Sequence, residues 1–197
     1  MCNEYGNHIP YDHYIAAFSR LKLPLFVKDN GPDLTPRDHI RIRDTAPVIR
    51  RAGDGVELTA LTWAPRSRNK KPVFNFRSEG RRFGKATRCL IPASHFYEFT
   101  AAKDAKQKRK DKWRFRLAGA DLFCIAGLVR PDAPDGTDCF TMLTTEPGPD
   151  VSPYHDRQVA ALAPEDWRAW LDLERREAEI LRPLPQGSLD VQIELSD

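Results

Sequence analysis

A cysteine stands second in the chain, directly after Met1. Removal of Met1, which a small second side chain permits, would leave a cysteine at the chain start, with its thiol and a free α-amine on adjacent carbons. Such a 1,2-aminothiol condenses with aldehydes, because the amine forms an imine and the nearby thiolate then closes a five-membered thiazolidine ring. An α-amine titrates at about pH 8, well below lysine, so a usable fraction is neutral and nucleophilic at physiological pH. On residue type alone, Cys2 is either this nucleophile or an incidental residue of a frayed terminus.

Two further side chains have types suited to proton transfer. Glu98 lies between Tyr97 and Phe99, and an apolar setting would raise the pKa of its carboxyl group toward acid–base use. The alternative for Glu98 is an ion pair with one of the nearby arginines. His155 lies in the loop-like segment 152–157, where an imidazole can shuttle protons. A lone histidine is, however, more often structural or merely exposed.

Positive charge is concentrated in two segments in the middle of the chain. Residues 66–88 hold nine Lys or Arg against one acidic residue, and residues 103–116 hold eight against two. The tail runs the other way, with nine acidic residues against four Arg in residues 164–197. The net charge is only +3, so this asymmetry indicates a surface that faces phosphate groups, or else two solvated faces.

The remaining composition indicates a reduced, intracellular setting without a metal or another cofactor. Four cysteines, Cys2, Cys89, Cys124 and Cys139, form no Cys-x-x-Cys pair, and no histidine has zinc-finger or H-E-x-x-H spacing. The start has no secretory signal and no segment has the length of apolar sequence that a membrane helix needs. We therefore expect a cytoplasmic protein with reduced thiols and no membrane partner.

Hydrophobic periodicity predicts how these residues are held in place. Helices are expected over 11–23, ended by Pro24, and over 164–173. Strands are expected at 46–51 and 56–63 around the turn Gly53-Asp54-Gly55, and at 89–92, 112–117, 122–129, 139–144 and 190–195. The lysine-rich segment 101–110 reads as a mobile loop or a basic flap over a ligand. Many short strands and few helices without a βαβ rhythm predict one α+β domain over 1–197, whose antiparallel sheet curls into a barrel.

Seven short motifs follow one another in an order that is specific when taken together. They are Met1-Cys2-Asn3-Glu4-Tyr5, Thr62-Trp63-Ala64-Pro65, Asn75-Phe76-Arg77-Ser78-Glu79, Arg88–Ser94 leading to Phe96–Phe99, Ile125–Leu128, Thr141–Thr145 and His155-Asp156-Arg157. On these motifs the sequence resembles the SRAP family, named for SOS response-associated peptidases, over nearly its whole length. The resemblance implies a β-rich antiparallel pseudo-barrel with a few flanking helices, and a monomer. It also implies covalent capture of abasic sites in single-stranded DNA by Cys2, after Met1 is removed, in the response to DNA damage.

The resemblance also implies roles for single residues. Asn75 would orient the cysteine amine and the sugar, although asparagine is also a common turn cap. Glu98 would assist Met1 removal and the proton transfers of ring opening and imine formation, and His155 would pass protons to the sugar oxygen. Arg77 and Arg157 would bind the phosphates that flank the lesion. The remaining predicted DNA contacts are a phosphate track at Arg81, Arg82, Lys85 and Arg88, and base stacking by Trp63 and Phe99, for which core packing is the alternative.

Four positions depart from the family pattern. Gln158 and Val159 follow Arg157 where the family often has Met-Pro, Asp44 takes the place of a proline that many members have near this position, and Phe99 replaces a common tryptophan. None of these changes removes Cys2 or its three predicted partners. We therefore expect them to alter the fit to DNA rather than the chemistry at Cys2.

Three classes of function fit these observations. The first is a protein that crosslinks the aldehyde of an abasic site, with low or single turnover. The second is a cysteine-dependent peptidase or amidohydrolase in which Cys2 attacks an amide, its own Met1 bond included, while Glu98 and His155 transfer protons. The third is a DNA-binding module without covalent chemistry, for which replacing Cys2 would leave all association with DNA intact.

Overall fold

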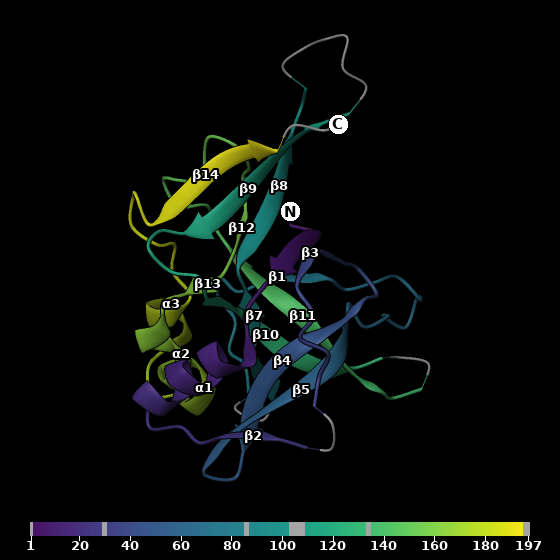
Figure 1. The fold of residues 1–197 in the computed structure, drawn as a ribbon. Coiled ribbons are helices and arrows are strands. Elements are labelled where there is room, and N and C mark those ends of the chain that lie inside the picture. The colour runs from purple at the N-terminus through teal and green to yellow at the C-terminus, as the bar shows by residue number, and fades with distance from the viewer. Residues whose placement is uncertain (1, 29–30, 85–86, 103–108, 133–134, 195–197) are drawn as a thin grey trace.

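The computed structural model describes residues 2–28, 31–84, 87–102, 109–132 and 135–194 (Figure 1). The elements, in chain order, are β1 (Glu4–Asn7), α1 (Tyr11–Arg20), β2 (Leu25–Val27), β3 (Arg37–Arg41), β4 (Thr45–Ala52), β5 (Gly55–Trp63), β6 (Asn75–Arg77), β7 (Arg88–Ala93), β8 (His95–Thr100), β9 (Asp111–Leu117), β10 (Phe123–Pro131), β11 (Asp138–Thr145), β12 (Gln158–Val159), β13 (Ala161–Leu162), α2 (Pro164–Asp172), α3 (Glu177–Ile180) and β14 (Leu189–Glu194).

Five strands close into a barrel. β5, β4, β7, β10 and β11 are joined by antiparallel pairs in that order, and β11 then pairs with β5 in parallel, which completes the ring. β6 adds to β11 in parallel, with Asn75 opposite Met142. β2 also pairs with β5 in parallel. The predicted α+β fold, rich in strands with few helices, is confirmed, and antiparallel pairing dominates with these three parallel exceptions.

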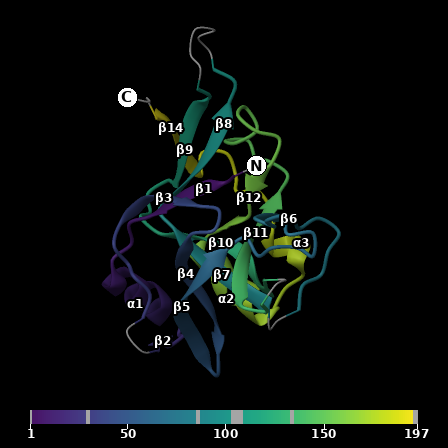
Figure 2. The same ribbon diagram turned by 90° about the vertical axis from the view of Figure 1, so that its right-hand side faces the viewer.

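A second sheet, in the order β14-β9-β8-β1-β3, packs against the barrel. Its β8, β9 and β14 extend beyond one end of the barrel (Figure 2). Because side chains alternate along a strand, one face of this sheet is apolar. Its Tyr5, Phe96 and Phe115 join a core cluster with residues such as Ile91 and Phe140 from the barrel. The chain start therefore lies where the two sheets meet.

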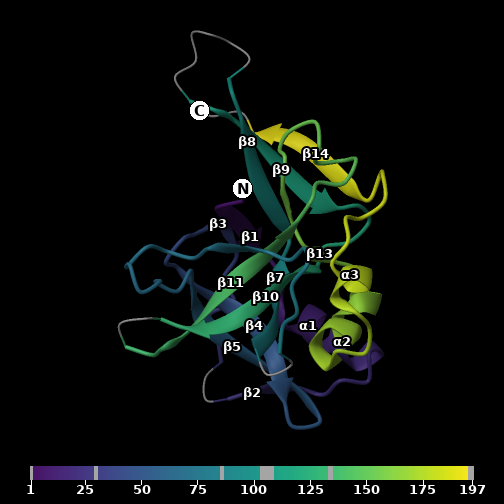
Figure 3. The same cartoon turned by 180° about the vertical axis from the view of Figure 1, so that it is seen from behind.

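The helices gather on one side of the barrel (Figure 3). Phe18 of α1 stacks on Trp167 of α2, with ring centroids 5.3 Å apart. Both rings belong to a second core cluster that includes Leu90 and Leu143 of the barrel strands. No helix among the described residues is long and apolar enough to cross a membrane.

The structure changes the predicted end of the first helix. α1 ends at Arg20, before Pro24. Lys22 takes a left-handed conformation (φ 54°), and the N–H groups of Leu21 and Leu23 both bond to the carbonyl of Phe18. This hydrogen-bonding pattern closes a helix before a following proline can.

Most predicted strands are present within one or two residues of the expected bounds, and α2 matches 164–173. The sequence reasoning missed the strand character of several segments, among them β1, which follows Cys2, β6, which carries Asn75, and β8, which carries Glu98. β1 and β6 are short, and β8 follows β7 after the single residue Ser94. The predicted loop or flap at 101–110 falls largely outside the described residues.

Candidate functional site

Cys2 is fully buried just before β1. Its Sγ donates a hydrogen bond to the carbonyl oxygen of Glu4, 3.2 Å away. Burial, followed by the negative charge of Glu98, raises the pKa of the Cys2 thiol far above its usual range. The thiol is therefore protonated at neutral pH while Cys2 remains inside the peptide chain.

Asn75 holds the backbone of Cys2. Its Nδ2 donates to the carbonyl oxygen of Cys2 over 2.7 Å. The parallel pairing of β6 with β11 places Asn75 beside Met142, a residue of the barrel core. Among the described residues, Oδ1 of Asn75 is a buried acceptor without a hydrogen-bond partner. Because buried acceptors are rarely left unpaired, this oxygen is available to a donor from outside the chain.

Glu98 contacts the backbone nitrogen of the same cysteine. Only 1% of Glu98 is exposed, and burial raises the pKa of its carboxyl group to about 7 even though the N–H of Cys2 donates to it. Glu98 lies on β8, directly beside β1 in the second sheet. Both protonation states of this carboxyl group are thus populated near neutral pH, as acid–base chemistry requires.

His155 completes the group. Its Nε2 lies 3.8 Å from Oε2 of Glu98. The N–H of Arg157 donates to Nδ1 of His155 over 3.0 Å, so the neutral ring carries its proton on Nε2, facing Glu98. Asp156 Oδ1 also lies 2.9 Å from Nδ1, but this carboxylate is 86% exposed, so water screens it. Burial lowers the pKa of His155, which favours the neutral ring.

The predicted residues Cys2, Asn75, Glu98 and His155 are thus brought together from four separate parts of the chain. Asn75 bonds the carbonyl and Glu98 the nitrogen of Cys2, so the cysteine backbone is fixed on both sides. If Met1 is removed, this nitrogen becomes an α-amine beside a carboxyl group that can exchange protons at neutral pH. The arrangement can activate an amine and a thiol toward an electrophilic carbon.

Arg157 is buried and already bonded to other groups of the protein, unlike an arginine that is free to bind a phosphate. Its guanidinium forms two hydrogen bonds to Glu79, of 2.7 and 2.9 Å, and further bonds to the carbonyl and hydroxyl oxygens of Thr144. Only 8% of Arg157 is exposed. In this structure Arg157 ties the loop of His155 to β11, and Glu79 occupies the face that a phosphate would need.

The other predicted phosphate ligands divide into two groups. Arg77, Arg81 and Arg82 are exposed, at the end of β6 and in the loop that follows it. The prediction that Arg88 belongs to the phosphate track is wrong. Arg88 is only 1% exposed, pairs with Glu177 and lies over the ring of Trp170. Its guanidinium therefore cannot reach DNA on the surface. Lys85 lies outside the described residues.

The two aromatic residues predicted to stack on bases do not border Cys2 in that way. Trp63 is fully buried, packs against Phe140 at 6.2 Å between ring centroids and donates from Nε1 to the carbonyl of Phe74. Core packing, the alternative for Trp63, is what the structure shows. Phe99 is half-buried, and strand alternation directs it to the face of β8 opposite Glu98.

An aromatic pair that the sequence reasoning missed lies next to the site. Trp113 stands opposite Glu98 in the β8–β9 register, and its ring centroid lies 4.5 Å from that of Tyr154. Tyr154 directly precedes His155, and both rings are partly exposed. The signal in the sequence is an aromatic residue between Lys112 and Arg114, within the basic segment 103–116.

The described residues contain no group of three or more His, Cys, Asp or Glu side chains arranged to hold a metal ion.

Comparison with solved structures places the fold among known proteins. A crystal structure of a protein from Bacteroides thetaiotaomicron matches 98% of this chain and 91% of its own, with a TM-score of 0.71 at 18% identity. A crystal structure from Bordetella bronchiseptica matches 99% of this chain and all of its own, with a TM-score of 0.70 at 22% identity. At these identities the likeness concerns the fold alone.

Curated relatives are similar over part of their length. The chain is 33% identical over 102 residues to the abasic site processing protein YoqW of Bacillus subtilis, which is 50% of this chain and 44% of that protein. It is 32% identical over 118 residues to the abasic site processing protein YoaM of the same organism, 58% of this chain and 48% of that one. The match thus spans less than half the length of these relatives.

The family model described as SOS response associated peptidase (SRAP) matches residues 1–194. The match covers all but three residues, including each of the four residues gathered around the Cys2 backbone. The chain belongs to the SRAP family.

Proposed function

We propose that this protein binds abasic sites in single-stranded DNA and captures them as a thiazolidine on Cys2 once Met1 has been removed. The observation that carries the proposal is the fixation of the Cys2 backbone by Asn75 and Glu98, with His155 beside the carboxyl group. The names of the curated relatives, abasic site processing proteins, support the choice of substrate.

The chemistry follows from the groups present. The neutral α-amine of Cys2 adds to the C1′ aldehyde of the opened sugar, and loss of water gives an imine. The thiol then adds its sulfur to the imine carbon and its proton to the nitrogen, which closes the ring. Glu98, a buried carboxyl group beside this nitrogen, accepts a proton from the amine and returns it to the departing oxygen. The unpartnered Oδ1 of Asn75 accepts a hydrogen bond from the amine or from a sugar hydroxyl.

The buried thiol supports an order of events. While Met1 is attached, the thiol is protonated and reacts poorly, because only the thiolate is a strong nucleophile. After cleavage, the protonated fraction of the α-amine on the neighbouring carbon would favour the thiolate, and its neutral fraction would add to the aldehyde. Reactivity toward aldehydes is therefore coupled to processing.

A second reaction is favoured by a specific contact. The Cys2 nitrogen that bonds to Glu98 is the leaving nitrogen of the Met1–Cys2 peptide bond. When water adds to the Met1 carbonyl and the C–N bond breaks, a protonated Glu98 can supply the proton that this nitrogen needs. We propose that the chain assists its own processing. In cell-free translation with methionine aminopeptidase inhibited, Glu98→Gln should retain Met1 by intact mass, whereas equal processing of both chains would exclude this role.

The test of crosslinking uses the processed protein and single-stranded DNA with one abasic site. We expect an adduct that survives denaturing electrophoresis, and none with a tetrahydrofuran analogue, which has no aldehyde. Cys2→Ser should abolish the adduct. Cys139→Ala, which removes another buried thiol, should leave it unchanged. An adduct that persists in Cys2→Ser, or no adduct with the processed protein, would refute the proposal.

A further inference from the structure

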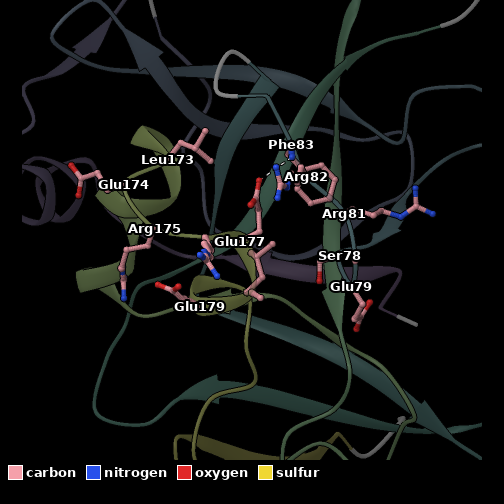
Figure 4. Close-up of a pocket in the computed structure, with 14 residues that line it drawn as sticks. Ser78, Glu79, Arg81, Arg82, Phe83, Leu173, Glu174, Arg175, Glu177 and Glu179 are labelled. Atoms are coloured by element: carbon pink, nitrogen blue, oxygen red, sulfur yellow. Dashed lines mark hydrogen bonds between the residues drawn. The ribbon is translucent and has the colours of Figure 1, made fainter.

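The loop that follows β6 separates two cavities. One, of about 1120 Å³, lies between residues 78–83 and residues 173–181 (Figure 4). The other, of about 400 Å³, shares Arg81, Arg82 and Phe83 with the first and is otherwise lined by Phe76, Gly84, Thr87, Leu128 and Arg130. The two cavities differ in the charge of the side chains that line them.

Two carboxylates of the larger cavity, Glu79 and Glu177, are paired with arginines that lie outside its lining. Glu177 accepts from Arg88 at 2.6 Å and from the N–H of Phe83 at 3.0 Å. Arg88 also donates to the carbonyl of Phe83. Glu79 pairs with Arg157, through the two hydrogen bonds given for the site. These contacts fix both ends of the loop, so its arginines project from an anchored backbone.

The smaller cavity holds three arginines and no acidic residue. The guanidinium of Arg81 lies 4.5 Å from the centre of the Phe76 ring and that of Arg130 lies 5.3 Å from it. Figure 4 shows Arg81 extending away from the segment that carries Glu174 and Glu179. Within the described part of the chain, the guanidiniums of Arg81 and Arg130 form no ion pair, whereas Arg82, which lines both cavities, also acts electrostatically on Glu177 of the larger one.

Such a cluster is unfavourable without an anion. Like charges gathered in one hollow repel one another, and a cavity lined by one sign of charge concentrates ions of the other. The guanidinium group also matches the geometry of phosphate oxygens better than an ammonium group does. The cavity volume is within the range of sites that hold small organic groups such as a nucleotide.

The position relative to Cys2 identifies the anion. Asn75 and Phe76 are consecutive in β6, and alternation directs them to opposite faces, Asn75 toward Cys2 and Phe76 toward the cavity. β6 pairs with β11 on one side, and no described strand pairs with its other edge. A strand of DNA bound at Cys2 would cross that open edge on its way to the arginines.

We propose that Arg81, Arg82 and Arg130, around Phe76, form a second binding site for the phosphodiester groups of the single strand that carries the lesion. This site rests on the proposed function for its ligand and lies on the opposite face of β6 from the reactive cysteine. Short DNA would engage Cys2 alone, and longer DNA would engage both sites.

The test measures the dependence on DNA length. Abasic DNA is supplied as a trinucleotide and as an oligonucleotide of about 15 residues, a length that spans typical single-strand sites. The ratio of their crosslinking efficiencies is compared for the full chain, the Arg81→Ala/Arg130→Ala variant and the Arg20→Ala control on α1, whose arginine is exposed. Affinity for the longer DNA is measured against salt with the tetrahydrofuran analogue, which cannot crosslink.

We expect the Arg81→Ala/Arg130→Ala variant to lower the long-to-short ratio by about five- to tenfold and the salt slope by about 0.7 for each phosphate that is no longer bound. Arg20→Ala should change neither quantity. An unchanged ratio and slope, or an equal decrease in Arg20→Ala, would overturn the second site. If no DNA crosslinks but affinity for the long DNA still depends on these arginines, the second site stands and the thiazolidine proposal fails.

Discussion

Glu98 carries the most unusual electrostatics of the site. It is a carboxyl group in an almost fully buried position, and its pKa of about 7 lies above the ordinary value of 4.5. Because the folded state holds the proton more tightly than the unfolded chain, Glu98 stabilises the fold fully below pH 4.5. That contribution is lost as the pH rises through 7. The protein thus keeps at its site a group that weakens the fold at neutral pH.

This burial predicts a change of stability with pH in the Glu98→Gln variant. The free energy of unfolding of the native chain, relative to the variant, should fall by roughly 3 kcal/mol between pH 4 and pH 8, since each tenfold change in proton affinity corresponds to about 1.4 kcal/mol. Urea denaturation at a series of pH values measures the difference. A difference that stays constant over this range would show that Glu98 has an ordinary pKa in the folded protein.

At the scale of elements, β1 sets the distance between Cys2 and Glu98. It pairs with β8 through Tyr5 and Gly6, and Gly6 lies opposite His95. A Cβ at Gly6 would meet the His95 ring at 2.1 Å and the backbone oxygen of Asp38 at 2.9 Å. Only glycine lets the two strands approach so closely, so the contact of the Cys2 nitrogen with Glu98 depends on a residue four positions away.

We therefore predict that Gly6→Ala slows adduct formation and destabilises the fold by about 1–3 kcal/mol, the usual cost of overpacking. Gly84→Ala is the matched control for stability, because a Cβ at Gly84 meets nothing within 4 Å, and Arg20→Ala, at an exposed position of α1, is the control for crosslinking. Single-turnover crosslinking and thermal unfolding measure the two effects. Native rates and stability in Gly6→Ala would mean that β1 does not constrain Cys2.

The elements most accessible to sequence reasoning are those with a strong local pattern. The hairpin of β4 and β5 was predicted from its β-branched residues and its Gly-Asp-Gly turn, and α2 from Trp167 and Trp170 on one face. β6 was not predicted, because it has three residues and exists through its parallel pairing with β11, far along the chain. Local patterns cannot report such pairing.

The site residues were predicted from motifs and the resemblance, while their contacts were not. Cys2, Asn75, Glu98 and His155 come together as expected. The settings of Arg157, Arg88 and Trp63 depend on partners that no local pattern names, such as Glu79 for Arg157 and Glu177 for Arg88. The sequence alone could not show whether these three side chains are buried or exposed to solvent.

At the scale of the whole molecule, closure of the barrel depends on the close packing of residues in its interior. Gly127 on β10 faces Ile91 and Cys89 on β7, and a Cβ there would lie 2.6 Å from Cδ1 of Ile91 and 2.9 Å from Sγ of Cys89. We predict that Gly127→Ala lowers the free energy of unfolding by about 1–3 kcal/mol in urea denaturation, with Gly84→Ala again unaffected. A native midpoint would mean that the barrel interior has room for a methyl group.

The parallel pairs of β11 with β5 and β6 join segments that are about seventy residues or more apart in the chain. Contacts of such long sequence separation form late and slowly during folding. Asn75 reaches the Cys2 carbonyl only when β6 has docked on β11, so a nascent or misfolded chain presents an ordinary N-terminal segment. Where removal of Met1 depends on Glu98, a chain that has not folded would keep Met1 on Cys2 and would present no reactive aminothiol to other aldehydes in the cell.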